Sequence, residues 1–179
     1  VGLPLNDIDI IITNPDTGDI LNQGEVGMIE IKGPNIFKGY FNMLEKTKKE
    51  FRPNGYFITG DMGIFDEDGY LTIVGREKDL IISGGYNIYP KEIEDTINEL
   101  GEVLECAVVG VPNEDLGEVP IAVIVTSSRK KEKDLENIKK NIQLKLAKFK
   151  NHHSYFFIDE LPRSTMGKVQ KTKLRDDYS

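Results

Sequence analysis

The chain has 179 residues, a formal net charge of −7 and 39% hydrophobic residues, which suits one ordinary domain or two small ones with a packed core. The acidic balance argues against a nucleic-acid surface or an anionic-membrane surface. The sequence shows no hydrophobic signal segment and no apolar run long enough to cross a bilayer. Cys106 is the single cysteine, which excludes a disulfide and a cysteine-rich metal site, and a reducing cytoplasm is the simplest location.

The amino-terminal part of the chain is predicted to be β-rich. A charged stretch, residues 45–51, is predicted to be a short helix. The strand-like runs in this part are residues 8–12, 28–32, 56–58 and 70–74. Short strands at close spacing, with turn residues between them, predict a small sheet or barrel.

An acid and a cation follow two neighbouring runs of this predicted sheet. Asp61 ends the segment that begins at Tyr56, and Arg76 ends the next run. The turn signal Asp66-Glu67-Asp68-Gly69 lies between them and predicts a hairpin, which would bring Asp61 and Arg76 together. A carboxylate that accepts two hydroxyl hydrogens and a forked guanidinium donor suit a ribose. The alternative is a surface hairpin with an incidental salt bridge.

From about residue 79 onward, predicted helices and strands alternate. Helices are predicted over 89–100 and 133–148, each with one apolar stripe, and Gly101 is expected to cap the first. The predicted strands are residues 80–82, 103–111, 121–125 and 154–158. This mixture predicts a compact α+β domain of ~100 residues.

A glycine pair and a histidine pair in this part are candidate sites. Gly84 and Gly85 follow Ser83 and leave no side chain in the way of an approaching ligand, but a glycine pair by itself favours a hairpin turn. His152 and His153 would point to opposite faces of a strand, and no clear third ligand lies near them. We therefore predict no metal site.

A lysine near the end of the chain sits on a predicted exposed loop. Pro162 and Gly167 bracket this loop, and Lys168 at its tip is a point charge on a long stem. The alternative is a lysine in a basic tail, because further cations lie close by, namely Arg163, Lys171, Lys173 and Arg175.

Three motifs in this order resemble the carboxy-terminal part of the adenylate-forming enzymes. They are YFITGD (56–61), GREKDLIISGGYNIYPKEIE (75–94) and LPRSTMGKVQK (161–171). That superfamily holds acyl-CoA synthetases, luciferases and the adenylation domains of peptide synthetases. Within it, the chain is most similar to malonyl-CoA synthetase and nearby short- to medium-chain acyl-CoA ligases, over nearly its whole length.

The resemblance implies two parts and an α+β fold. Residues 1–77 would be the last β subdomain of the large adenylate-forming domain, and residues 78–179 the mobile carboxy-terminal domain. Lys78 matches the hinge residue about which the small domain turns between two catalytic poses.

The resemblance also implies site residues and substrates. Asp61 and Arg76 match the ATP or AMP ribose site. Ser83, Gly84 and Gly85 match the channel for the pantetheine arm of coenzyme A.

The implied reaction has two halves. A substrate carboxylate attacks the α-phosphate of ATP and releases pyrophosphate, and the thiol of coenzyme A then displaces AMP. Lys168 matches the lysine that enters the active site for the first half. The phosphate loop, the acyl pocket and the Mg²⁺ ligand are expected upstream of Val1, in an amino-terminal domain of the same chain. The present chain alone is therefore expected to be inactive.

The acyl substrate and two other functions stay open. A preference for malonate rests only on resemblance around residues 57–61 and 147–150, and a role in fatty acid metabolism is implied. An adenylation domain that loads a carrier protein shares all three motifs. A non-catalytic, partner-binding module predicts instead that Lys168→Ala leaves the biological role intact.

Overall fold

The computed structural model describes residues 2–127, 131–146 and 154–179, without side chains over 131–134. It divides into two compact units, Val1–Lys78 (unit 1) and Asp79–Ser179 (unit 2). The α+β fold class is confirmed, because unit 1 contains an antiparallel sheet with one helix, and unit 2 contains a mostly antiparallel sheet, in which only β9 (Ser154–Phe157) runs parallel to its neighbour, with three helices in the described residues. No helix among the described residues is long and apolar enough to cross a membrane.

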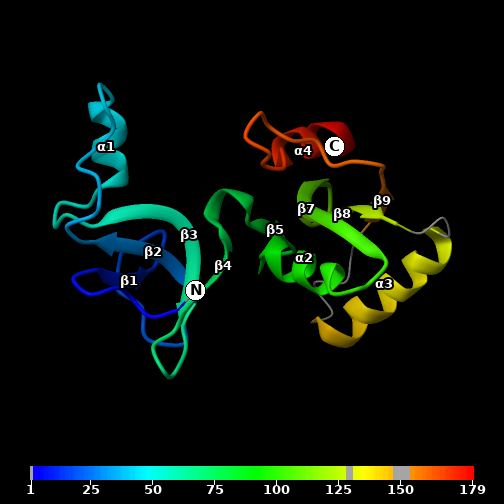
Figure 1. Cartoon of the computed structure of the whole chain (residues 1–179), viewed down its shortest axis with the longest axis horizontal. Helices are drawn as coiled ribbons and strands as arrows, with labels where there is room; N and C mark the ends of the chain where they lie inside the picture. Colours follow the sequence, from blue (N-terminus) through cyan, green and yellow to red (C-terminus); the bar gives the residue numbers. More distant parts are fainter. Residues whose placement is uncertain (1, 128–130, 147–153) are drawn as a thin grey trace. The chain divides into compact units, whose positions relative to one another are not determined.

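Unit 1 is a four-stranded antiparallel sheet in the order β1-β2-β3-β4, with one short helix, α1 (Leu44–Glu50) (Figure 1). Its strands are β1 (Asp9–Thr13), β2 (Gly27–Lys32), β3 (Phe57–Phe65) and β4 (Leu71–Arg76). The four predicted runs are therefore strands, and a small sheet is confirmed. Ile12, Ile29 and Leu71 form the buried centre of its apolar cluster.

The predicted hairpin joins β3 to β4. The Asp66 carboxylate accepts the backbone N–H groups of Asp68 and Tyr70 at 3.0 and 2.8 Å. Gly69 has a φ of +81°, which a glycine adopts without strain. The side-chain bond and the glycine together close the turn, as the sequence signal predicted.

Unit 2 is built on the long antiparallel pair β7 (Val103–Asn113) and β8 (Gly117–Thr126). The other strands of its sheet pair with each other or with β8, and they are β5 (Ile81–Ser83), β6 (Tyr86–Ile88) and β9 (Ser154–Phe157). Both long strands extend beyond the predicted runs and meet in a tight turn. The Asn113 side chain accepts two backbone N–H groups of that turn, at 3.1 and 3.0 Å.

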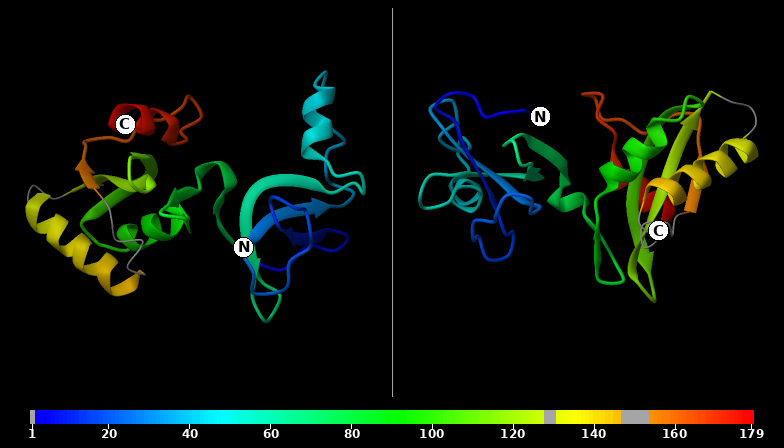
Figure 2. Two further views of the ribbon diagram at one scale, coloured as in Figure 1. Left: turned by 180° about the vertical axis from the view of Figure 1, so that it is seen from behind. Right: turned by 90° about the horizontal axis from the view of Figure 1, so that it is seen from below.

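Helices cover both faces of this sheet. The helices α2 (Pro90–Asn98) and α3 (Lys131–Lys145) lie on one face, and α4 (Lys171–Tyr178) lies on the other (Figure 2). Along β7, Val108 belongs to the cluster under α2 and α3, whereas Val109 belongs to the cluster under α4. Both faces of β7 and β8 are therefore buried, which fixes their register.

Two local predictions differ from the structure. Gly101 does not cap α2, because the helix ends at Asn98 and Glu99 closes it by donating its N–H to the Asp95 carbonyl at 3.1 Å. Helix α4 was not predicted, because most of its side chains are polar and Leu174 is its one fully buried residue. The histidine pair at 152–153 and the segment 147–150 lie outside the described residues.

Cys106 is buried in the cluster under α2 and α3, as predicted. Burial and, to a smaller degree, the charge of Glu94 raise the pKa of the thiol, while Lys171 acts in the opposite direction. We predict that an Ellman-type reagent at pH 8 detects no thiol on the native chain within minutes, and one thiol per chain after denaturation. Rapid reaction with the native chain, at the rate of a free thiol, would contradict the buried position.

Candidate functional site

Asp61 and Arg76 face each other across the β3–β4 hairpin of unit 1. They are register partners, and the Arg76 Nε lies 2.7 Å from the Asp61 Oδ1. The Arg76 side chain is 53% exposed and the Asp61 side chain 25% exposed, so a ligand can reach both. The predicted pairing is confirmed, and it places a carboxylate acceptor beside a guanidinium donor at the edge of the unit 1 sheet.

The local backbone holds Asp61 in place. The Thr59 hydroxyl donates to the Ile29 carbonyl of β2 at 2.8 Å and accepts the Asp61 N–H at 3.0 Å. Gly60 between them has a φ of +74°, a conformation that favours glycine. The β2–β3 register shifts at this level, between Met28 and Glu30. Thr59 therefore bridges the irregularity and fixes the backbone at Asp61, a role that the sequence did not reveal.

An ion pair joins the buried Glu30 of β2 to Arg52, which lies between α1 and β3. The Glu30 side chain is 2% exposed and accepts bonds from the Thr13 hydroxyl at 2.7 Å and from the Arg52 Nη2 at 2.8 Å. The hydrogen bond to Glu30 raises the pKa of Arg52 further above its ordinary value. Because breaking such a pair leaves a buried charge uncompensated, this network holds β2 in register with its neighbours.

Lys78 is the last residue of unit 1. It is exposed and lies in a single 3₁₀ turn, η1 (Glu77–Asp79), between β4 and β5. The boundary between the compact units follows it directly. A short turn of this kind can absorb a change of backbone torsion without breaking a strand or a longer helix.

The glycine pair forms the β5–β6 turn of unit 2. Gly84 and Gly85 have φ values of +55° and +82°, so a glycine is favoured at each position. The Gly84 N–H donates to the Leu116 carbonyl at 2.9 Å, and Ser83 pairs with Gly117 of β8. Ser83 is buried, whereas both glycines are exposed. The hairpin turn and the open approach to its backbone are thus both present.

Lys168 lies on a closed loop between β9 and α4. Within that loop the Ser164 N–H donates to the Lys168 carbonyl at 2.8 Å, and the Gly167 N–H donates to the Ser164 carbonyl at 2.9 Å. Gly167 has a φ of +77°. Lys168 itself is exposed, as predicted from the bracketing proline and glycine.

Three of the basic residues around Lys168 have acidic neighbours, unlike the side chains of a solvated basic tail. Arg163 is ion-paired with Glu105, Lys171 with Glu94, and Arg175 lies 3.9 Å from an Asp79 oxygen. Within the described parts of the chain, the Lys168 ammonium has no ion-pair or hydrogen-bond partner. The loop therefore presents the Lys168 charge without a partner among the residues described, whereas Arg163, Lys171 and Arg175 each have an acidic neighbour.

The Lys168 loop and the glycine turn lie at opposite ends of unit 2. The loop is joined to Glu105 near the start of β7, whereas Gly117, beside the glycine turn, pairs with Asn113 at the end of that strand. These two points of β7 are about 26 Å apart at ~3.3 Å per residue. The right-hand view of Figure 2 shows the orange loop and the green β5–β6 turn at the two ends of the unit.

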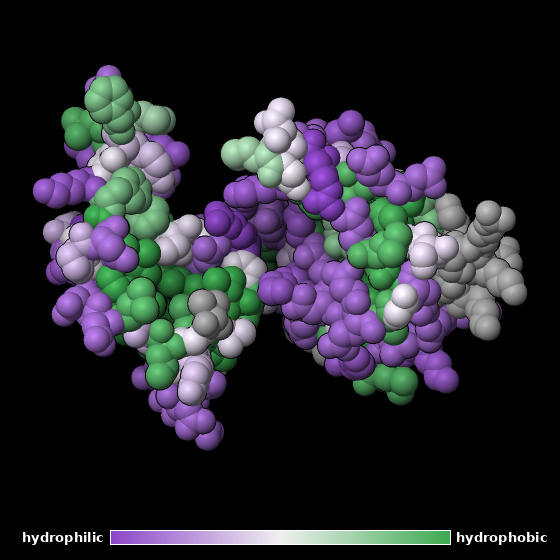
Figure 3. All heavy atoms as spheres, viewed as in Figure 1, coloured by the Kyte–Doolittle hydropathy of each residue, from purple (hydrophilic) through white to green (hydrophobic). Residues whose placement is uncertain are grey.

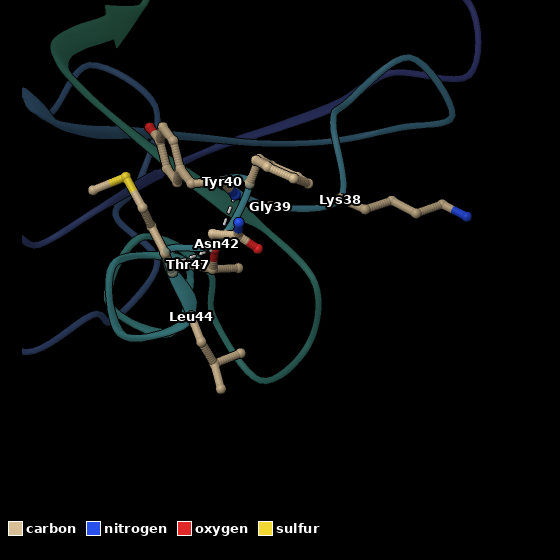
Figure 4. A pocket seen from close by; sticks show the side chains of 8 residues that line it. Lys38, Gly39, Tyr40, Asn42, Leu44 and Thr47 are labelled. Carbon is tan, nitrogen blue, oxygen red and sulfur yellow. Dashed lines mark hydrogen bonds between the residues drawn. The ribbon is translucent and has the colours of Figure 1, made fainter.

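A hollow beside α1 contains none of the predicted site residues. It has a volume of about 580 Å³, and it is lined by Lys38, Gly39, Tyr40, Phe41, Asn42, Met43, Leu44 and Thr47. The Thr47 hydroxyl accepts the Tyr40 N–H at 2.9 Å (Figure 4). Green, apolar side chains gather at this end of unit 1 in Figure 3, and Phe41 is 90% exposed.

In the described part of the chain, no group of three or more His, Cys, Asp or Glu side chains is placed to hold a metal.

Known proteins resemble this chain over nearly its whole length. Residues 92–168 match the family model of the AMP-binding enzyme C-terminal domain. The chain is 40% identical to a putative acyl-CoA ligase, YdaB, of Bacillus subtilis, over 98% of the chain and 34% of the relative. Other matched relatives are named long-chain-fatty-acid, 2-succinylbenzoate and indoleacetate CoA ligases.

Solved structures match both units. ATP-bound MatB from Rhodopseudomonas palustris matches with a TM-score of 0.89 and 50% identity, over 99% of this chain and 35% of MatB. Apo MatB matches over the same shares with a TM-score of 0.75, so the matched region differs between the two MatB structures. The o-succinylbenzoate CoA synthetase MenE of Bacillus subtilis, in complex with an acyl-adenylate, matches with a TM-score of 0.88 and 36% identity, over 97% of this chain and 34% of MenE.

Unit 2 thus has the fold of the carboxy-terminal domain of AMP-binding enzymes. The chain belongs to the carboxy-terminal portion of the adenylate-forming acyl-CoA synthetase superfamily, and its homologues are acyl-CoA ligases. It spans about a third of the length of the curated relatives it matches.

Proposed function

We propose that the protein containing this chain joins a carboxylic acid to coenzyme A at the expense of ATP. In the first half-reaction the carboxylate displaces pyrophosphate from ATP and forms an acyl-adenylate. In the second, the thiol of coenzyme A loses its proton, attacks the acyl carbon and releases AMP. The observation that carries the proposal is the placement of Lys168 and the glycine turn at opposite ends of a domain matched to AMP-binding enzymes.

The Asp61–Arg76 pair suits the ribose of ATP. The carboxylate can accept the hydrogens of two vicinal hydroxyl groups, and the guanidinium can donate to the ring side of the same sugar. Both side chains are within reach of a ligand, and Thr59 fixes the backbone at Asp61. In this role the pair orients the nucleotide and takes no part in bond making.

Lys168 is the residue we assign to the first half-reaction. Negative charge gathers on the α-phosphate and on the carboxylate oxygens as the new P–O bond forms. An ammonium that is delivered only in this pose stabilises the transition state more than the separate substrates, which raises the rate rather than the affinity alone. Its lack of an acidic partner within the described residues leaves its full charge for this purpose.

The glycine turn is the element we assign to the second half-reaction. The pantetheine arm of coenzyme A is a thin chain, and the backbone of Gly84 and Gly85 offers a wall without side chains, with Ser83 behind it. Since about 26 Å of strand separates this turn from the Lys168 loop, one pose of unit 2 cannot bring both to one reacting carbon. Rotation about Lys78 would exchange them.

The identity of the acyl group is the most specific part of the proposal. We infer malonate or another short- to medium-chain acid, supported by the sequence resemblance to malonyl-CoA synthetase around residues 57–61 and 147–150. The matched relatives are three times as long as this chain, so we also propose that the chain alone has no ligase activity.

We predict that Lys168→Ala in the full-length protein lowers pyrophosphate exchange with ATP and carboxylate on the order of 10²–10³-fold. Thioester formation from a supplied acyl-adenylate should stay within about threefold of the unchanged protein, because the lysine is withdrawn in that pose. Lys173→Ala is the matched control, since Lys173 is an exposed lysine five residues further along, on α4. Survival of both half-reactions in Lys168→Ala would favour a partner-binding module.

We predict that a panel of carboxylic acids offered to the full-length protein gives the highest kcat/KM for malonate. The panel should include acetate, methylmalonate, 2-succinylbenzoate and a long-chain fatty acid, with acyl-CoA formation measured directly. Faster turnover of acetate or of the long-chain acid would overturn the malonate assignment and leave the two half-reactions untouched. Transfer of the acyl group only to a carrier protein, and not to coenzyme A, would favour a carrier-loading adenylation domain.

A further inference from the structure

Two ion pairs bracket the loop that carries Lys168. Before the loop tip, the Arg163 Nη2 contacts a carboxylate oxygen of Glu105 on β7. After it, the Lys171 Nζ lies 2.6 Å from the Glu94 Oε1 on α2. Glu105 lies on a strand of the central sheet, and Glu94 lies on a helix packed against that sheet. The loop is therefore attached to the rigid part of unit 2 at each end.

The Glu94–Lys171 pair is the more deeply placed of the two. The exposed fractions are 16% for Glu94 and 24% for Lys171. The same Glu94 oxygen also accepts the Val108 N–H of β7 at 2.8 Å, so the carboxylate is itself held by the strand. Leu174, one turn further along α4, is buried in the apolar cluster. The first turn of α4 is therefore fixed by one ion pair and one core contact.

The Arg163 side chain links the anchor to the loop itself. Besides Glu105, its guanidinium donates from Nη1 to the Gly167 carbonyl at 2.8 Å. Gly167 directly precedes Lys168, so one rigid planar group spans the distance from β7 to the backbone next to the lysine. The Gln170 N–H closes the base of the loop by donating to the Pro162 carbonyl at 2.8 Å.

We propose that Arg163 and Lys171 are positioning residues for Lys168, with Glu105 and Glu94 as their anchors. This inference rests on the proposed role of Lys168 in the first half-reaction. A long, exposed lysine gains a defined direction only if its backbone is fixed, and a misplacement of about 1 Å can cost on the order of 10² in rate. A merely structural role for these pairs would instead weaken the domain as a whole and affect both half-reactions alike.

The test uses Arg163→Met and Lys171→Met in the full-length protein, because methionine removes the charge and keeps an apolar stem. Each should lower kcat for pyrophosphate exchange about 10- to 100-fold, with KM for ATP and thioester formation from a supplied acyl-adenylate within about twofold. Glu105→Gln, which removes the partner of Arg163, should give the same pattern more weakly. Lys173→Met is the matched control and should change neither half-reaction.

Combination with Lys168→Met shows whether the two residues act through the lysine. We expect no further loss of pyrophosphate exchange when Arg163→Met or Lys171→Met is added to Lys168→Met, because the lysine that they would position is already absent. Losses that multiply would overturn the positioning role, and so would equal losses in both half-reactions. If Lys168→Met alone leaves pyrophosphate exchange unchanged, the proposed function fails, and the positioning role fails with it.

A measurement on the 179-residue chain itself keeps the inference separate from activity. Amide hydrogen exchange at Gly167 and Gln170 should be faster in Arg163→Met, because both N–H groups close the loop that the guanidinium holds. The control Lys173→Met should leave these amides unchanged. Unaltered exchange in Arg163→Met would show that the guanidinium does not hold the loop.

Discussion

The long β7–β8 ladder is the constraint on which the rest of unit 2 depends. Both faces of these strands are buried, so their register and length cannot change without exposing one of two apolar clusters. The ladder therefore acts as a rigid spacer between the Lys168 loop and the glycine turn. In the mechanism we propose, this separation explains why one small domain serves two chemical steps only by changing its pose.

Unit 1 contributes a site of a different kind. The Asp61–Arg76 pair depends on a hairpin whose turn is closed by Asp66 and Gly69, and on Thr59, which fixes the backbone at the irregular β2–β3 level. In the proposed mechanism, this pair would hold the sugar of the nucleotide in a constant position while unit 2 changes its pose. A stationary nucleotide site and an exchanging domain suit a reaction whose adenylate is made in one step and consumed in the next.

The sequence predicted the local features and missed the non-local ones. The hairpin, the glycine turn and the exposure of Lys168 follow from turn chemistry within a few residues, and the structure confirms each of them. The burial of Glu30 does not follow from the sequence, because its partner Arg52 is 22 residues away and the alternation around it resembles a solvent-facing strand. The anchoring of Arg163 by Glu105, 58 residues earlier in the chain, was hidden for the same reason.

The exchange of the two ends about Lys78 is most directly tested by a distance measurement in the full-length protein. Nitroxide labels would be placed at Thr72 of unit 1 and Asn98 of unit 2, both exposed, while the buried Cys106 stays unlabelled. Pulsed electron resonance would compare the protein with ATP and carboxylate against the protein with coenzyme A and an acyl-adenylate analogue. Two distinct label distances are expected, one for each condition. A single distance under both conditions would contradict the exchange of the two ends.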